Sequence, residues 1–203
     1  MSPLRNRVAP DGELIATAAH GAMFGNRGVL HDASGEIVRQ AQVKRWLVCE
    51  LSFRERWRPA MTPNRYTGLF FLDEAVALAA GHRPCAECRH ADYQRFRAFW
   101  AETKGLPGLP RAADIDAVLD DERKTNDGRR RTIPTPAKTL PDGVFVEHEG
   151  HHWLVHANTL HRWTPGGYSD RRELPTGELR LLTPPSTAEV ISAGFRPRLS
   201  LVD

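Results

Sequence analysis

Two cysteines separated by two residues carry the most specific chemical signal in the sequence. Cys85 and Cys88 lie in the segment 81–88, directly after a run of alanines. Two thiolates at this spacing can bind one tetrahedral zinc ion at about 2.3 Å, because the turn between them places both sulfurs on the same side of the backbone. A thioredoxin-type redox pair needs a βαβ context, whereas a helix is expected before these cysteines. The spacing therefore favours zinc, with two metal-free buried thiols as the remaining alternative.

The residues around this pair form a longer pattern. Two phenylalanines, Phe70–Phe71, are followed by an alanine-rich helix and then by Gly-His-Arg-Pro-Cys-Ala-Glu-Cys at 81–88. This pattern resembles the end of the Ada-type N-terminal metal-binding domain. That family repairs methylphosphotriesters in DNA by transferring the methyl group to one of four zinc-bound cysteines. An earlier strand of the family ends in two cysteines, and residues 46–49 stand in the corresponding place, so that the resemblance spans residues 44–90.

The resemblance implies that Cys85, Cys88 and Cys49 are zinc ligands. Phe53 stands where the family has its other thiol, four residues after Cys49, so the chain offers three thiolates. The fourth ligand is then water or one of the nearby histidines His82, His90, His20 and His31. A protein ligand would close the site and make it structural, whereas water would leave a Lewis acid for catalysis. We expect a closed structural site without methyl-acceptor activity, because small domains commonly need metal for stability.

A basic segment with one aromatic residue follows Cys49. It contains Arg54, Arg56, Trp57 and Arg58. Guanidinium groups can contact phosphates and an indole can stack on a base, so this segment is the candidate nucleic-acid contact. A solvated basic loop is the alternative. The net charge of +3 agrees with a polyanionic partner without requiring one.

Glu122 is a candidate catalytic acid or base. On a helix over residues 112–124 it projects onto the same face as Ile115 and Leu119, and a carboxyl group on an apolar face has a raised pKa unless it is paired. The alternative is that an arginine such as Arg123 neutralises it. With an open zinc position or with Glu122, the chain would be a metal-dependent hydrolase or nuclease. A third alternative is an interaction protein in which zinc only stabilises the fold.

The C-terminal third holds two other groups of interest. Five histidines fall within fourteen residues: His148, His151, His152, His156 and His161. On one strand His152 and His156 are about 13 Å apart, too far for one ion, so we expect exposed strand histidines. Residues 163–168 place Trp163 and Tyr168 around a glycine-rich turn, which either stacks on a flat ligand or closes the end of a hairpin.

Several local patterns predict the elements that must position these residues. A strand is expected over residues 45–51, and Asp73 caps a helix over 74–80 that ends at Gly81. Helices are also expected over 13–20, 91–103 and 112–124, and a hairpin turns at Glu149–Gly150 between residues 144–146 and 153–155. A strand over 178–182 and a helix opened by a capping box at 186–189 and closed by Gly194 complete the pattern. Residues 125–142 show no apolar period and are expected to form a linker.

These elements predict an α+β protein in three parts. Residues 1–110 form an Ada-like zinc module with an N-terminal segment and a following helix, 111–142 a short helix and a Pro/Arg-rich linker, and 143–203 a small α+β extension. The chain has 203 residues, 40% of them hydrophobic, without an apolar run long enough for a membrane helix or a signal peptide. A cytoplasmic location is therefore expected, and in that compartment three cysteines do not suit a disulfide framework. The function that agrees best with these features is zinc-stabilised nucleic-acid binding in DNA repair or processing.

Overall fold

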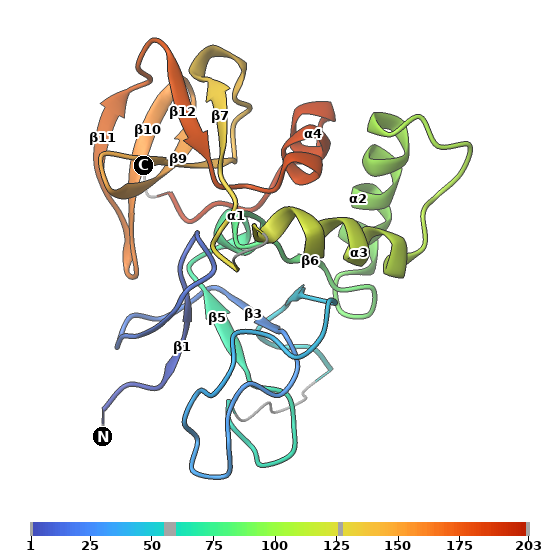
Figure 1. Cartoon of the computed structure of the whole chain (residues 1–203), viewed down its shortest axis with the longest axis vertical. Coiled ribbons are helices and arrows are strands. Elements are labelled where there is room, and N and C mark those ends of the chain that lie inside the picture. Colours follow the sequence, from blue (N-terminus) through green and yellow to red (C-terminus); the bar gives the residue numbers. More distant parts are fainter. Residues whose placement is uncertain (1, 55–59, 126–127, 202–203) are drawn as a thin grey trace.

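The computed structural model describes residues 2–54, 60–125 and 128–201, which form both helices and sheets. The predicted α+β class is therefore confirmed. Two six-stranded sheets lie at different ends of the molecule, and helix α1 lies between them (Figure 1). The helices are α1 (Glu74–Ala79), α2 (His90–Thr103), α3 (Ala112–Arg123) and α4 (Pro185–Ala193). No helix within the described residues is both long enough and apolar enough to cross a membrane.

The first sheet has the strand order β2-β1-β5-β3-β4-β6. Its strands are β1 (Arg5–Val8), β2 (Leu14–Ala16), β3 (Met23–Asn26), β4 (Leu47–Cys49), β5 (Leu69–Phe71) and β6 (Arg83–Pro84). The pairs β1·β5 and β4·β6 are parallel, and the other neighbours are antiparallel. The strand expected over residues 45–51 is confirmed as β4, although it is shorter.

Residues 14–16 form β2, so the helix expected over residues 13–20 is wrong. A turn reverses the chain after β1: Gly12 has a φ of +93°, and its N–H donates to the Ala9 carbonyl at 2.9 Å. Val8 then pairs with Leu14 in antiparallel register. The Asp11-Gly12 turn signal outweighs the helical pattern because glycine adopts a positive φ without steric cost.

Helix α1 begins and ends where the sequence predicts. The Asp73 carboxylate accepts a hydrogen bond from the Val76 N–H at 3.0 Å, which is the N-cap interaction, and Gly81 follows the helix with a φ of +93°. All six residues of α1 are buried. The small alanine side chains let this helix contact β4 and β5 of the first sheet and β8 (Phe145–His148) of the second.

The predicted helices over residues 91–103 and 112–124 are confirmed as α2 and α3. The last helix, α4, starts at Pro185 and is followed by Gly194 with a φ of +131°. The capping box predicted at residues 186–189 is wrong because Ser186 and Thr187 already lie in the first turn. Proline is favoured at that first position, since its fixed φ suits a helix and its missing N–H is not needed there.

The second sheet has the order β11-β10-β9-β8-β12-β7. Its further strands are β7 (Ile133–Pro136), β9 (His151–His156), β10 (Thr159–Thr164), β11 (Gly167–Glu173) and β12 (Glu178–Leu181). The predicted hairpin is confirmed as β8·β9, with Glu149 and Gly150 both at positive φ in the turn. The predicted strand over residues 178–182 is β12.

Residues 133–139, within the expected linker, are ordered parts of the fold. They form β7 and the short 3₁₀ helix η1 (Ala137–Thr139), and β7 pairs with β12 over four residues. The sequence shows no strand pattern here because β7 is an edge strand that contains Pro134 and Pro136, which are tolerated only at an edge. The linker prediction is therefore wrong for this segment.

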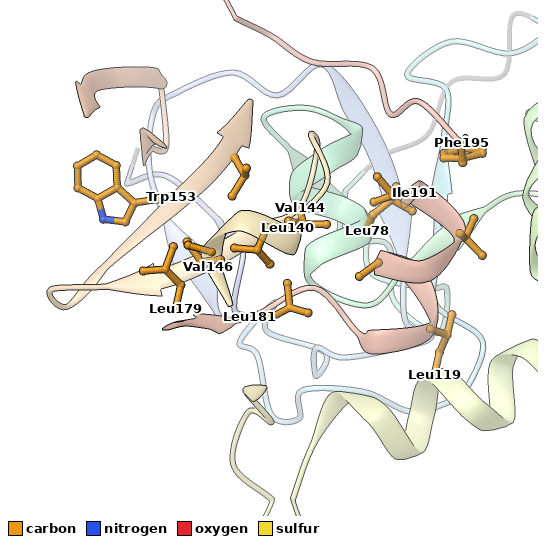
Figure 2. Packing of buried hydrophobic residues seen from close by; sticks show 14 of the residues in the cluster. Leu78, Leu119, Leu140, Val144, Val146, Trp153, Leu179, Leu181, Ile191 and Phe195 are labelled. Atoms are coloured by element: carbon orange, nitrogen blue, oxygen red, sulfur yellow. The ribbon is translucent and has the colours of Figure 1, made fainter. Parts of the chain in front are cut away.

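Two large buried clusters connect the sheets to the helices. The first packs the second sheet against the helices (Figure 2), and its labelled members include Leu78, Leu119, Val146, Trp153, Leu181, Ile191 and Phe195. The second surrounds α1 and combines residues of the first sheet, such as Val8 and Phe71, with Phe145 and Leu154 of the second sheet. Residues on both sides of the boundary expected at 143 thus share one core.

Candidate metal centre

The parallel pair β4·β6 brings two cysteines together. Leu47 pairs with Arg83 and Val48 with Pro84, so Cys49 and Cys85 follow at the same level of the two strands. The Cys85 N–H donates to the Val48 carbonyl at 3.0 Å, which fixes this register. Cys88 comes from the turn that leads into α2. Two segments of backbone, the end of β4 and the stretch between β6 and α2, therefore deliver the three sulfurs.

The three cysteines fit a thiolate metal site. Their sulfur atoms all lie within 4.8 Å of one another, and sulfurs around a tetrahedral zinc ion at about 2.3 Å are expected about 3.8 Å apart. The side chains of Phe24, Leu47 and Phe70 pack around them. Cys49 and Cys85 are buried, whereas Cys88 is partly exposed. A small soft cation fits this apolar, sulfur-lined position.

Hydrogen bonds among the thiols divide their protons unequally. The pKa of Cys85 is lowered to about 2, because Cys49 and Cys88 and the backbone N–H groups of Cys88 and Glu87 donate to its sulfur. The pKa of Cys49 is raised, because its thiol hydrogen-bonds to Cys85 and Cys88 and is buried. A cation among the three sulfurs would take the place of these shared protons, as expected for thiolate ligands.

Sulfur donors select zinc, copper(I) or iron–sulfur clusters, and not magnesium or calcium. Among the residues that the structure describes, no histidine, carboxylate or further thiol joins Cys49, Cys85 and Cys88 as a fourth ligand. The three cysteines expected to be ligands thus lie close together and could bind a metal ion of this class.

The four candidate histidines lie outside this group. His82 is fully buried, but its Nε2 accepts from Arg27 at 3.2 Å and its Nδ1 contacts the Ala77 carbonyl. His90 contacts the Ala86 carbonyl at 3.0 Å, and His31 contacts Thr67 at 2.6 Å. His20 is exposed before β3. As positioned, none of them completes the site.

A buried ion network secures the turn that holds Cys88. Arg89 forms ion pairs with Glu74 and Asp92, both at 2.6 Å, and contacts Glu50 at 3.5 Å. Arg198 joins the network from the C-terminal segment, at 2.9 Å from Glu50 and 3.0 Å from Asp92. Sequence reasoning missed this network because its members come from four distant segments. No charge pattern within any one of these segments predicts the network.

Glu122 lies at the start of α4 and not among the cysteines. Its carboxylate accepts hydrogen bonds from the Ser186 hydroxyl at 2.6 Å and from the Ser186 N–H at 3.1 Å. It therefore satisfies donors at a helix N-terminus. Arg123, the expected neutralising partner, instead packs on the Trp46 ring at 4.0 Å. These contacts describe a capping role, and a catalytic role of Glu122 stays a prediction.

The basic segment after Cys49 is described only in part. Arg54 is exposed, with a φ of +52° and its guanidinium 4.9 Å from the Phe53 ring centroid. Arg56, Trp57 and Arg58 lie outside the described residues. The nucleic-acid contact expected of this segment stays a prediction.

Two of the five C-terminal histidines and part of the glycine-rich turn line a separate cavity of about 990 Å³. It is lined by residues that include His156, His161, Gly166, Gly167 and Tyr168. His161 is buried and His148, His152 and His156 are partly buried, so the expectation of exposed strand histidines is confirmed only for His151. The Tyr168 hydroxyl donates to Asp73 at 2.7 Å, which ties the turn to the N-cap of α1. The turn between β10 and β11 therefore packs against the start of α1, and the cavity lies beside this turn.

Comparisons of the chain with protein-family models, with curated proteins and with solved structures found no match. The three-cysteine site therefore has to be interpreted from its own geometry.

Proposed function

We propose that this chain is a zinc-stabilised nucleic-acid-binding protein of Ada-like design that has kept the metal and lost the methyl-acceptor chemistry. The observation that carries the proposal is the convergence of Cys49, Cys85 and Cys88 within 4.8 Å. These are the three positions that the Ada resemblance implies as ligands. Action in DNA repair or processing would follow from the same resemblance.

The placement of the cysteines supports a structural role for zinc. The metal would join the end of β4 to the segment between β6 and α2, which lies far from β4 in the sequence. Zinc bound only by the folded state adds its binding free energy to the stability of that state. Strands β4 and β6 are short and form few hydrogen bonds of their own, so a metal crosslink between them would add substantially to their stability.

The burial of the thiols argues against methyl transfer. A methylphosphotriester in DNA must reach the accepting sulfur, and Cys49 and Cys85 are only 5% and 8% exposed. Phe53 also replaces the fourth thiolate, so the metal complex would carry less negative charge and its sulfurs would be weaker nucleophiles. After incubation with methylphosphotriester DNA, we expect no gain of a methyl group in the intact mass. A methyl group mapped to Cys49 would contradict this.

Metal analysis tests the zinc assignment. Protein purified without chelator is expected to contain one zinc per chain, and Cys88→Ser to lose it. Ala86→Ser, an exposed position in the same turn, is the matched control and should keep the metal. Protein without zinc, or a Cys88→Ser variant with unchanged zinc content and melting temperature, would remove the basis of the proposal.

Salt dependence tests the nucleic-acid part. If Arg54, Arg56 and Arg58 contact phosphates, each contact contributes about −0.7 to −0.9 to the slope of log affinity against log salt. Replacing the three arginines by glutamine should flatten that slope, whereas replacing Arg111, an exposed arginine that pairs with Asp114, should not. Absence of binding to DNA and RNA at low salt would count against a nucleic-acid partner.

One observation favours a second function, hydrolysis at an open metal position. Only three protein ligands lie together in the described part of the chain, and Cys88 is partly exposed. A water on the fourth position would be activated by zinc. Substitution of zinc by cobalt distinguishes the two cases. If the fourth ligand is an exchangeable water, azide or cyanide can replace it, and this replacement changes the visible absorption spectrum of cobalt. A spectrum unchanged by these anions would exclude the hydrolase.

A further inference from the structure

Three arginines gather around the starts of β4 and β6, at the opposite ends from the cysteines. Arg27 follows β3, Arg123 ends α3, and Arg130 precedes β7. The side chains of Arg27 and Arg123 are almost completely buried, at 1% and 4% exposure. Arg130 is partly buried, and its Nη1 donates to the Arg123 carbonyl at 3.4 Å. Such burial is unusual for arginines, which are seldom enclosed without charged partners.

One tryptophan orients two of these guanidinium groups. The Arg27 guanidinium lies 3.9 Å from the Trp46 ring centroid, and that of Arg123 lies 4.0 Å from it. Arg27 also donates its Nε–H to His82 at 3.2 Å and one Nη1–H to the Gly12 carbonyl at 2.9 Å. Stacking on the indole fixes the guanidinium planes. Arg123 Nη2 donates to the Lys44 carbonyl at 2.7 Å, and its other N–H groups remain for further partners.

Several of these N–H groups have no hydrogen-bond acceptor. In the part of the chain that the structure describes, the unpartnered buried atoms include Arg27 Nη2, Arg123 Nε, Arg123 Nη1 and Arg130 Nε. Buried donors in native proteins are nearly always satisfied, because a donor without an acceptor loses its hydration without compensation. Four unpaired nitrogens on three adjacent arginines therefore indicate a missing acceptor.

The neighbouring carboxylates do not supply that acceptor. Asp116 is occupied by Arg83, with both oxygens engaged at 2.8 and 2.9 Å. Asp120 is 3.7 Å from Arg123 Nη1, beyond hydrogen-bond distance, and is also 3.5 Å from Lys44. Asp11 lies 3.5 Å from Nε2 of His152 in the second sheet and forms an ion pair with that side chain. The arginine cluster thus keeps an excess of positive charge.

The charges of the arginines also act on one another. Burial lowers the pKa of Arg123 and of Arg130 to about 10. Burial and the charges of Arg123 and Arg130 together lower the pKa of Arg27 well below its usual value. An anion among the three guanidinium groups would relieve both the repulsion and the missing hydrogen bonds.

The backbone makes room for this arrangement. Gly81 has a φ of +93°, and a β-carbon there would lie 2.5 Å from Cγ of Arg123. A side chain at position 81 would therefore displace Arg123 from Trp46. Gly81, which follows α1, thus also leaves the space that the Arg123 side chain occupies in the cluster.

We propose that Arg27, Arg123 and Arg130 form a binding site for a phosphate-type oxyanion. Guanidinium groups suit phosphate because their planar forks make charge-assisted, bidentate hydrogen bonds to its oxygens. The ligand is either free inorganic phosphate or the phosphate group of a nucleotide, since both present the same oxygens. This site goes beyond the proposed function and does not depend on zinc.

Calorimetry and thermal melting at constant ionic strength test the site. We expect inorganic phosphate to bind one site per chain and to raise the melting temperature relative to chloride. A second arm compares an oligonucleotide that carries a 5′-phosphate with the same oligonucleotide that has a 5′-hydroxyl. Preference for the phosphorylated end assigns the site to a nucleotide phosphate, and binding of inorganic phosphate alone assigns it to the free anion. Binding of neither overturns the proposal.

A matched pair of variants locates the binding. Arg130→Gln should weaken phosphate binding by about tenfold or more, because it removes a charge-assisted hydrogen bond. Arg131→Gln changes the next residue, whose guanidinium donates to the Lys124 carbonyl, and should leave binding unchanged. If Arg130→Gln does not fold, Arg123→Lys, which keeps the charge and loses the fork, takes its place. If phosphate affinity falls equally in Arg131→Gln and in the cluster variant, Arg130→Gln or Arg123→Lys, the assignment of the site would be contradicted.

Discussion

At the residue scale, one arginine connects the candidate metal centre to the rest of the fold. Arg89 directly follows Cys88, and its side chain is completely enclosed beside Glu74, which is also almost fully buried. Carboxylates from α1 and α2 converge on it. Removing one member of a buried pair leaves an uncompensated charge, which costs much more than the pair itself contributes.

Arg89→Met should therefore lower the free energy of unfolding by about 3–5 kcal/mol. The matched control is Arg95→Met, since Arg95 also pairs with Asp92, at 2.5 Å, but its side chain is 64% exposed. We expect the control to cost less than about 1 kcal/mol. Urea denaturation measures both values, and equal losses would show that burial of Arg89 is not what makes it important.

The same network predicts a dependence on pH. Burial raises the pKa of Asp92, but hydrogen bonds and charges from its arginine partners outweigh that effect, so the pKa lies below its usual value. A carboxyl group with a lowered folded pKa adds stability above its unfolded pKa of about 4, and this contribution is lost as the pH falls further. Asp92→Asn should reduce the acid sensitivity below about pH 4 in melting experiments. An identical pH profile would contradict the role of Asp92.

At the element scale, the start of α4 depends on a carboxylate from another helix. Ser186 donates its N–H and hydroxyl to Glu122, so α3 provides the cap that the sequence of α4 itself lacks. A carboxylate at this end also interacts favourably with the helix dipole.

Glu122→Ala should lower the free energy of unfolding by about 1–2 kcal/mol, the usual effect of losing an N-cap. Asp121→Asn, an exposed change one residue earlier, should have little effect. Thermal melting compares the two variants. If Glu122→Ala leaves stability unchanged but abolishes an enzymatic activity, that result would contradict the capping role and support a catalytic role of Glu122.

The elements differ in how far local sequence predicts them. Helix α1 and the β8·β9 hairpin carry their own signals, an N-cap aspartate and a two-residue turn at positive φ. Strand β7 has no such signal, because prolines and an edge position hide its pairing with β12. The Cys85/Cys88 pair is likewise local, whereas the position of Cys49 depends on the parallel β4·β6 pairing. The three arginines and Trp46 come from four segments, so no spacing in the sequence predicts their cluster.

At the scale of the whole molecule, α1 couples the two sheets. The buried cluster around it contains side chains from both, and the Asp73 carboxylate at its start accepts from Tyr168 of β11 and from the Ser200 N–H. A shared core of this kind favours cooperative unfolding.

We therefore expect a single unfolding transition. Tryptophan fluorescence, which is sensitive to Trp153 in the second sheet and Trp46 beside the first, should change at the same temperature as the far-ultraviolet circular dichroism. A zinc chelator should shift the whole transition to lower temperature, because metal binding is linked to the folded state. Two separate transitions, only one of them sensitive to the chelator, would show that the sheets unfold independently.

The prolines of β7 have a consequence for how the molecule meets others. The Ala137 N–H donates to the Gly177 carbonyl at 2.8 Å, and N–H groups alternate in direction along a strand. Pro134 and Pro136 therefore occupy the outward positions, where a further strand would need donors. At the opposite border, residues 169–173 of β11 are all exposed and mostly charged. Both borders thus resist strand-by-strand aggregation, and a partner of the second sheet must bind it by side chains and not by extending its ladder.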